Sequence, residues 1–335
     1  MKKPVLEYVT TCAPLRISFV GGGTDLPSFY QKSVGSVLST SIDKRIYVTV
    51  KKMGKLYGNN YRLNYSETEI VPSIDQIQNI IARECLQLVP IASPLYIGTV
   101  ADIPAGSGLG SSSCFAVGLL KALHLMRGEN VSNIQIAEEA CYIEMNALNR
   151  PVGKQDHYAS TFGGMNVLKF QSDGRVQVEP LQLGLPRITK LFKHLLIFWT
   201  AISRDAGEIL SEQKAKTGNK FDVLSEMRDQ VSLLQNILTT DFSIKKFGQM
   251  MHEGWLMKRG LTSKITSSKI DKWYGDALRA GAYGGKLCGA GGGGFLLFVA
   301  PPDSHDAIRR ALSDLQEEDI NFEPHGVRSI VDITF

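Results

Sequence analysis

The chain has 335 residues, of which 43% are hydrophobic and 21% charged, and its formal net charge is +4. At roughly 100 to 200 residues per domain, this length predicts two globular domains. A net charge this small, without a cluster of Lys and Arg, argues against a nucleic-acid-binding protein. The five cysteines form no CxxC or Cys/His metal pattern, and neither an apolar signal core nor a run of about 18 apolar residues occurs. We therefore expect a cytoplasmic protein that is neither secreted nor inserted in a membrane.

The first third of the chain predicts strands followed by buried helices. Residues 8–20 and 44–52 alternate as β-strands do, and the first run ends at three consecutive glycines. A third predicted strand, residues 94–103, leads directly into the glycine- and serine-rich segment 104–113. The apolar stretch after this segment predicts a helix that stops at Gly128. A capping box begins a second helix at Ser132.

The rest of the chain predicts a second domain of different composition. Residues 165–170 and 175–181 resemble a hairpin, and 193–201 a strand. Because the composition turns helical and polar soon afterwards, we place a boundary near residue 190, which gives domains of 1–190 and 191–335. A second glycine run at 286–294 precedes an apolar strand, a helix over 306–318 and a last strand over 327–335.

The segment 104–113 has the composition of a phosphate-binding loop. Glycines let the backbone approach an anion, and the N-terminus of the following helix adds partial positive charge. The first turn of that helix carries no Asp or Glu, so its positive field is free for a ligand. The loop is neither a Walker A sequence nor a dinucleotide-binding fingerprint. An ordinary flexible loop is the alternative.

Two carboxylates are candidates for the chemistry of phosphoryl transfer. Asp156 lies in a short polar stretch bracketed by glycines, where it could orient or deprotonate a hydroxyl nucleophile, and Lys154 could balance phosphate charge. Glu144 lies about 60° from the centre of the apolar face of its predicted helix, so it borders the core. Beside a triphosphate it would be a natural magnesium ligand. A turn-forming aspartate and a solvated glutamate are the alternatives.

The triple glycine at 21–23 separates further candidates. Arg16, on the preceding strand, could neutralise charge on a transferred phosphoryl group. Thr24 and Asp25 follow the glycines, and aspartate is suited to pairing with vicinal sugar hydroxyls. Ordinary strand and turn roles are equally open for these residues.

Three segments together resemble the three motifs of the GHMP kinases, the superfamily of galactokinase, homoserine kinase, mevalonate kinase and phosphomevalonate kinase. They are residues 13–27, 103–123 and 286–298, and their order and spacing span nearly the whole chain. Within the superfamily, residues 16–30 and 150–164 look most like the bacterial D-glycero-D-manno-heptose 7-phosphate kinases, as do residues 195–210. The first motif reads GGGTD rather than the GEHTD of galactokinases, which argues against a galactokinase.

The resemblance implies an α+β fold of two domains, one like ribosomal S5 domain 2 and one a ferredoxin-like α/β sandwich, with the active site in the cleft between them. It implies ATP and Mg²⁺ as cofactors, Asp156 and Arg16 as catalytic residues, and Glu144 with Ser112 at the metal. The residues implied to bind the ATP phosphates are Pro104, Gly106, Ser107, Gly108, Gly110, Ser111, Ser112 and Ser113. Those implied to bind the substrate are Gly22, Gly23, Thr24, Asp25, Lys154, Gly289, Gly291 and Gly292.

The expected reaction is ATP-dependent phosphorylation of the anomeric hydroxyl of D-glycero-D-manno-heptose 7-phosphate to the 1,7-bisphosphate, a step of nucleotide-activated heptose biosynthesis. A kinase for a neutral sugar, such as L-fucose or an N-acetylhexosamine, is the alternative, and a non-catalytic sensor of ATP and sugar is another. The partners are therefore ATP and a small sugar phosphate, with neither nucleic acid nor membrane, and the oligomeric state is open. The phosphate of the acceptor calls for cations, for which Lys154, Arg204, Arg150 and Lys286 are candidates. The segment 61–71 is the positional candidate for the adenine pocket.

Overall fold

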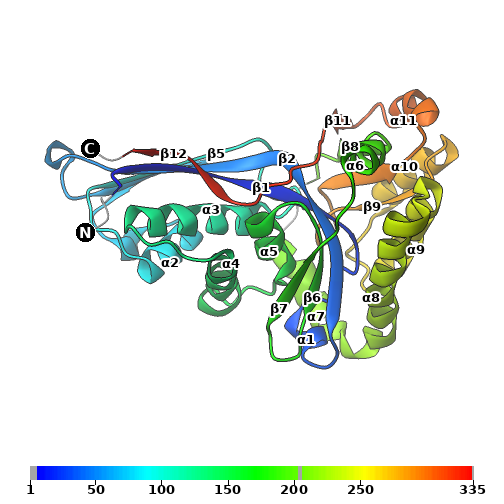
Figure 1. Ribbon diagram of the computed structural model, residues 1–335, viewed down its shortest axis with the longest axis horizontal. Coiled ribbons are helices and arrows are strands. Elements are labelled where there is room, and N and C mark those ends of the chain that lie inside the picture. Colours follow the sequence, from blue (N-terminus) through cyan, green and yellow to red (C-terminus); the bar gives the residue numbers. More distant parts are fainter. Residues whose placement is uncertain (1–5, 203–205, 334–335) are drawn as a thin grey trace.

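The computed structural model describes residues 6–202 and 206–333, which form two β-sheets with helices packed against each (Figure 1). The larger sheet has the order β12-β1-β2-β5-β3-β4, and β6 and β7 extend from β2. Its strands are β1 (Tyr8–Val20), β2 (Gly35–Lys52), β3 (Tyr61–Asn64), β4 (Thr68–Val71), β5 (Leu95–Ala101), β6 (Met165–Phe170), β7 (Val176–Pro180) and β12 (Arg328–Ile333).

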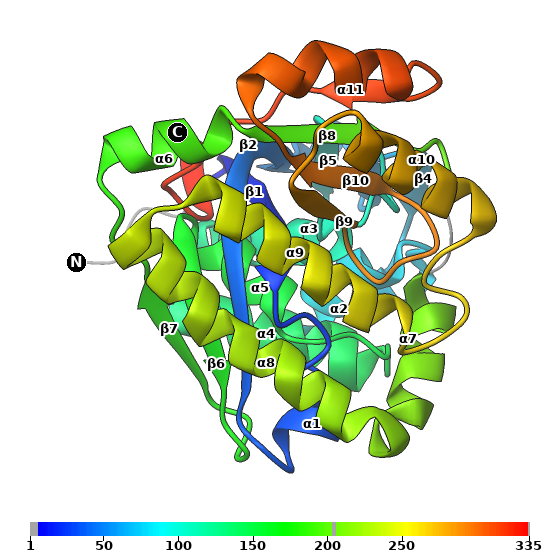
Figure 2. The same cartoon turned by 90° about the vertical axis from the view of Figure 1, so that its right-hand side faces the viewer.

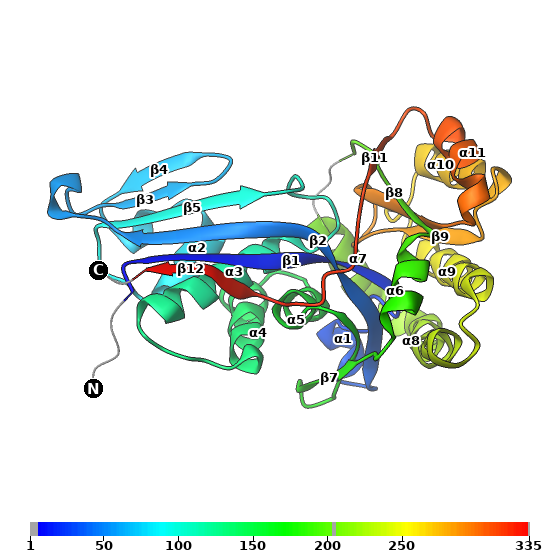
Figure 3. The same cartoon turned by 45° about the horizontal axis from the view of Figure 1, so that its top comes forward.

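The long strand β2 connects two parts of this sheet. Residues 35–40 pair with β6, whereas residues 46–52 pair with β5, so one strand serves two neighbours on the same edge. Figure 3 shows the helices α2 to α5 gathered under one face of the sheet. They are α2 (Ile80–Leu88), α3 (Ser111–Met126), α4 (Asn133–Tyr142) and α5 (Gln155–Phe162). The helix predicted after the glycine-rich segment is α3, and Ser132 caps α4 as predicted by accepting from the Gln135 amide at 3.2 Å.

The smaller sheet has the order β11-β8-β10-β9, and all its neighbours are antiparallel. Its strands are β8 (Leu195–Trp199), β9 (Gly284–Leu287), β10 (Phe295–Val299) and β11 (Gln316–Glu318). Helices separate β8 from β9 and β10 from β11, which is the β-α-β-β-α-β arrangement of ferredoxin-like folds. The remaining helices are α1 (Pro27–Tyr30), α6 (Leu185–Phe192), α7 (Ala206–Lys216), α8 (Phe221–Asn236), α9 (Ile244–Arg259), α10 (Ser268–Arg279) and α11 (His305–Ala311). The two-domain α+β prediction is confirmed.

The path of the chain differs from the predicted one in the last 30 residues. The helix predicted over 306–318 ends at Ala311, and Gln316–Glu318 instead form the edge strand β11 on β8. The last strand, β12, returns to the larger sheet and pairs antiparallel with β1. A single boundary at residue 190 therefore separates β12 from the sheet to which it belongs.

One apolar core runs through both halves of the molecule. Val231 of α8 and Phe247 of α9 belong to the same cluster of buried side chains as Ile17 and Phe19 of β1. Figure 2 shows α8 and α9 crossing in front of β1 and β2. No helix among the described residues is long and apolar enough to span a membrane.

Candidate active site

A cavity of about 860 Å³ is lined by residues of both halves of the chain. Its wall draws on four segments that the sequence singled out, namely residues 22–26, 104–113, 150–156 and 288–293. The motifs that are far apart in the sequence therefore meet at one place. The lining also includes apolar side chains, among them those of Ile81 and Phe115.

The predicted phosphate-binding segment 104–113, called the phosphate loop below, leads into the N-terminus of α3. Gly106, Gly108 and Gly110 have φ values of 75°, 80° and 85°, a left-handed conformation that residues with a side chain rarely adopt. Gly110 is the N-cap of α3, and the first turn of the helix carries no acidic residue. The helix N-terminus thus faces the cavity with its backbone N–H groups free for an anion.

Most of the predicted loop residues reach the cavity. Its wall includes Pro104, Gly106, Gly108, Gly110, Ser111, Ser112 and Ser113. Ser107 does not line it. This residue is fully buried, its carbonyl accepts from the Phe295 amide at 3.3 Å, and its hydroxyl lies 3.4 Å from that of Ser111. Ser107 therefore joins the loop to β10.

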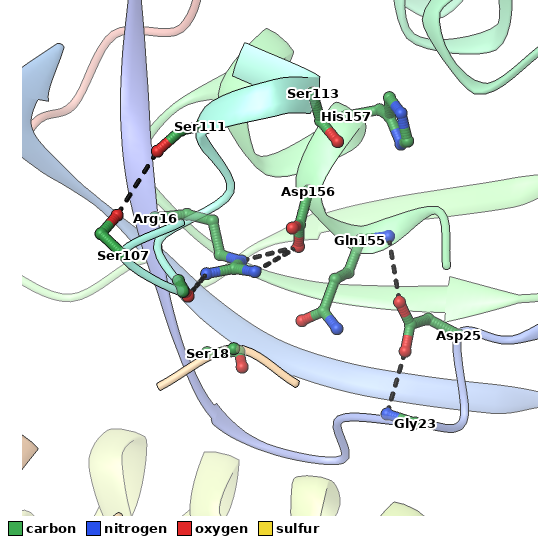
Figure 4. A network of polar contacts seen from close by, with 12 residues as sticks. Arg16, Ser18, Gly23, Asp25, Ser107, Ser111, Ser113, Gln155, Asp156 and His157 are labelled. Carbon is green, nitrogen blue, oxygen red and sulfur yellow. Dashed lines mark hydrogen bonds and ion pairs between the residues drawn. The ribbon is translucent and has the colours of Figure 1, made fainter. Parts of the chain in front are cut away.

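Arg16 and Asp156 form an ion pair in the wall of the cavity (Figure 4). Nε and Nη2 of Arg16 lie 2.8 and 2.5 Å from Oδ1 of Asp156, and Nη1 donates to the Gly108 carbonyl at 2.9 Å. Asp156 lies in the first turn of α5, a helix that the sequence did not predict. A Cβ atom at Gly110 would lie 3.3 Å from the Asp156 carboxyl, so the glycine lets this side chain approach the phosphate loop closely.

Asp25 also lines the cavity, near this pair (Figure 4). Its carboxylate accepts from the backbone amides of Gly23 at 2.9 Å and Gln155 at 3.4 Å (Figure 4). Burial, together with the negative charge of Asp156, raises the pKa of Asp25. Gly22 and Gly23 also line the cavity, but Thr24 does not, because its hydroxyl contacts the carbonyl oxygens of Gly21 and Ser36 inside the turn.

Glu144 is fully buried rather than bordering the core as predicted. It lies in a π-helical turn, Ile143–Ala147, to which the angular spacing of a regular α-helix does not apply. Its carboxylate accepts from Ser113 Oγ at 2.6 Å, His157 Nε2 at 2.8 Å and Arg150 Nη1 at 2.7 Å. Burial alone would raise the pKa of Glu144, but the contact with His157 and the hydrogen bond from Ser113 lower it to about 2.

These contacts place Glu144 directly behind the cavity wall. Ser113 and Arg150 both line the cavity and both bind its carboxylate. His157 is fully buried and hydrogen-bonded to Glu144, so it supports that carboxylate from inside the protein.

Besides Thr24, the structure does not bring the predicted substrate residues Lys154 and Gly292 to the cavity. Lys154 Nζ contacts the Glu138 carboxylate at 3.0 Å and donates to the Gly174 carbonyl at 2.7 Å, on the side of the β6–β7 hairpin. In the second glycine run, Gly289 and Gly291 line the cavity, whereas the Gly292 amide donates to the Ile265 carbonyl at 2.8 Å.

The other candidate cations for an acceptor phosphate are distributed differently. Lys286 is buried and does not line the cavity, and it donates to the backbone carbonyls of Ser18, a lining residue, at 2.7 Å and of Phe19 at 3.3 Å. Burial and the nearby Lys258 lower the pKa of Lys286 to about 7. Arg204 lies outside the described residues. Arg150 reaches the cavity while bonded to Glu144.

The polar residues of the cavity wall that the sequence analysis missed include Lys258 of α9, Gln155 of α5 and Gln213 of α7. Lys258 is 6% exposed and donates to the Gly289 carbonyl, and burial lowers its pKa to about 8. Gln155 Oε1 and Gln213 Nε2 are buried without a hydrogen-bond partner among the described residues. None of the three carries a local signal, because a single polar residue on a helix could equally face water.

The positional candidate for the adenine pocket is partly at the cavity. Tyr65 and Ser66, from the segment 61–71, line it together with Asn79. The other residues of this segment do not line the cavity.

Known proteins resemble this chain over its whole length. The GHMP kinases N terminal domain matches residues 74–164, and the GHMP kinases C terminal domain matches residues 233–318. The D-glycero-alpha-D-manno-heptose 7-phosphate kinase of Campylobacter jejuni is 29% identical over 97% of this chain and 99% of that protein. The L-fucokinase/L-fucose-1-P guanylyltransferase of Bacteroides fragilis is 27% identical over 90% of this chain, but only 36% of that longer protein is matched.

Solved structures share the fold. That of a D-glycero-D-manno-heptose 1-phosphate kinase from Bacteroides thetaiotaomicron superposes with a TM-score of 0.79 at 23% identity, covering 96% of this chain and 99% of the other. The two domain matches together span just over half of the chain, in the order in which the two sheets occur. This protein is therefore a member of the GHMP kinases, which use ATP to phosphorylate small molecules.

Proposed function

We propose that the protein transfers the γ-phosphoryl group of ATP to the anomeric hydroxyl of D-glycero-D-manno-heptose 7-phosphate, giving the 1,7-bisphosphate for nucleotide-activated heptose biosynthesis. The observation that carries the kinase chemistry is the Arg16–Asp156 pair, held against the phosphate loop at 2.9 Å from Arg16 Nη1 to the Gly108 carbonyl. The acceptor is inferred from the heptose 7-phosphate kinase of Campylobacter jejuni, whose sequence matches 97% of this chain.

Each polar group of the cavity has a separate role in an in-line phosphoryl transfer. The backbone N–H groups at the start of α3 bind the phosphates, and Asp25 receives hydroxyls of the acceptor. Asp156 accepts the proton of the attacking hydroxyl as its oxygen bonds to the γ-phosphorus and the bond to ADP breaks. Arg16 holds Asp156 in place and neutralises charge on the group in transit.

The side chains of Ser112 and Glu144 offer the types of oxygen ligand that a magnesium ion prefers. Mg²⁺ prefers oxygen ligands, one or two of them carboxylates, and a Glu144 pKa of about 2 keeps that carboxylate ionised at neutral pH. Glu144 would be one protein ligand of the ion; its Oε1 is bonded to Arg150, which lines the cavity. Ser112, on the cavity wall, would be the second protein ligand. The ion would supply charge neutralisation for the β- and γ-phosphates.

A kinase for a neutral sugar is the second candidate. Two observations favour it: the likeness to an L-fucokinase over 90% of the chain, and the positions of Lys154 and Lys286, which do not reach the cavity.

The test is ADP release with Mg-ATP against the heptose 7-phosphate and a panel of free hexoses including L-fucose, for the wild type and Asp156→Asn. We expect turnover on the heptose phosphate alone and a loss of about 10²- to 10⁴-fold in the variant. Asp173→Asn, in the exposed turn between β6 and β7, is the matched control. Turnover only on a free sugar would reject the heptose phosphate as acceptor, and none on any acceptor despite ATP binding would favour a sensor.

A further inference from the structure

Lys258 brings a positive charge from the C-terminal half of the chain to the cavity. It lies in the last turn of α9, is 6% exposed, and lines the cavity wall. Its Nζ donates to the carbonyl oxygen of Gly289, in the second glycine run. Arg16, Asp156 and the phosphate loop all belong to the N-terminal half, so Lys258 faces them from the other domain.

The carbonyl that holds Lys258 is in contact with the phosphate loop. A Cβ atom at Gly289 would lie 2.5 Å from the Gly108 Cα, so the two backbones pack directly on each other. The Gly108 carbonyl is also the acceptor for Arg16 Nη1, at 2.9 Å. Arg16 and Lys258 are therefore anchored on two touching backbone segments, at the point where the γ-phosphate of bound ATP would meet the acceptor.

Lys258 differs from the other cations of this wall in having no carboxylate partner among residues 6–202 and 206–333. Arg16 is paired with Asp156, and Arg150 with Glu144. The charged and titratable groups that act on Lys258 are Cys288, Arg16, Asp25, Asp156 and Lys286. Burial raises the pKa of the Cys288 thiol, so that group is neutral and supplies no counter-charge.

An unpaired ammonium in this position is costly unless an anion joins it. Burying a charge without a partner is unfavourable, and burial lowers the pKa of Lys258 to about 8. An arriving phosphate would bind the ammonium, raise that pKa and offset the cost. The site is thus built for an anion that is present only when substrate is bound.

We propose that Lys258 contacts the phosphoryl group during its transfer, so that the group meets one cation from each domain, Arg16 and Lys258. The inference rests on the proposed kinase activity but not on the identity of the sugar. Charge that develops on the equatorial oxygens is where fixed cations lower the barrier most.

The test compares steady-state kinetics of Lys258→Met with those of the wild type and of Lys246→Met, an exposed lysine of the same helix. We expect kcat to fall about 10²- to 10³-fold in Lys258→Met, with the acceptor KM within about threefold, and no change in Lys246→Met. Affinity for a fluorescent ATP analogue should change by less than about tenfold, which would show an intact nucleotide site.

The pH profile gives an independent measure. Since the ammonium form is the active one, kcat/KM of the wild type should fall as the pH rises through about 8, and this limb should be absent from the residual activity of Lys258→Met. An increase in acceptor KM with kcat unchanged, or a limb that persists in the variant, would overturn the proposal. A wild type without turnover on any acceptor would refute the kinase proposal itself, whereas an active wild type with an equally active variant would refute only the role of Lys258.

Discussion

Replacing Lys258 by methionine should raise the free energy of unfolding of the protein while lowering its kinase activity. The pKa of Lys258 is lowered from 10.5 to about 8, chiefly by burial. At 1.36 kcal/mol per unit, this difference makes the buried ammonium destabilising by about 3 kcal/mol at neutral pH. The variant also loses the hydrogen bond to the Gly289 carbonyl, which lowers its stability by about 1 kcal/mol. The net gain in free energy of unfolding is about 2 kcal/mol, or about 3 °C in Tm for a chain of this length.

The pH dependence gives this prediction its sign. Below pH 8 both the folded and the unfolded chain hold the proton, so the wild type carries the full cost. Between pH 8 and 10.5 the unfolded chain binds more protons than the folded one, and the stability of the wild type rises with pH relative to the variant. Urea unfolding followed by tryptophan fluorescence at pH 7 and pH 10 measures both values. A variant less stable than the wild type at pH 7, or an advantage that does not shrink by pH 10, would refute the reasoning.

Three further substitutions test the geometry of the cavity. Glu144→Gln should lower the free energy of unfolding by up to about 3 kcal/mol at pH 7, because the carboxylate pKa falls from 4.5 to about 2 on folding. This contribution is present above about pH 4.5 and is lost as the pH falls toward 2, so urea unfolding should show a smaller difference at pH 3, and an equal difference would contradict the assignment. Gly153→Ala would place a Cβ atom 1.9 Å from Asp25 Oδ2 and should raise the acceptor KM at least about tenfold, whereas Gly218→Ala, with no atom within 4 Å, should leave the kinetics unchanged. Arg16→Lys keeps the charge but loses the forked contact with the Asp156 carboxylate, so kcat should fall at least about tenfold with the affinity for ATP nearly unchanged, as measured by nucleotide titration.

Local signals explain the elements that the sequence predicted well. The alternating run at 8–20 became β1, and the glycine-rich loop before α3 lies at the cavity, because turns, caps and alternation are set by neighbours in the chain. The helix α5 was missed since its eight residues show no clear apolar face in the sequence. The pairing of β12 with β1 joins residues more than 300 positions apart, and no local pattern encodes it.

The directions of the side chains were harder to predict than the positions of the motifs. Thr24 and Asp25 are neighbours, yet the Thr24 hydroxyl bonds to a carbonyl inside the turn, whereas the Asp25 side chain lines the cavity. Likewise Lys154 points to Glu138 while Asp156, two residues on, pairs with Arg16. Which of two adjacent polar residues faces a ligand depends on tertiary contacts, and the inward course of Lys258 from α9 depends on them entirely.

The continuous core constrains how substrates enter. Phe19 of β1 and Phe247 of α9 meet edge to face with their ring centroids 5.1 Å apart, and Lys286 of β9 donates to carbonyls of β1. A hinge motion that separated the two sheets would expose these apolar side chains to water, which is unfavourable. Exchange of ADP for ATP must then proceed through movements of short segments at the rim of the cavity. Heat or denaturant should correspondingly unfold both halves in one cooperative step.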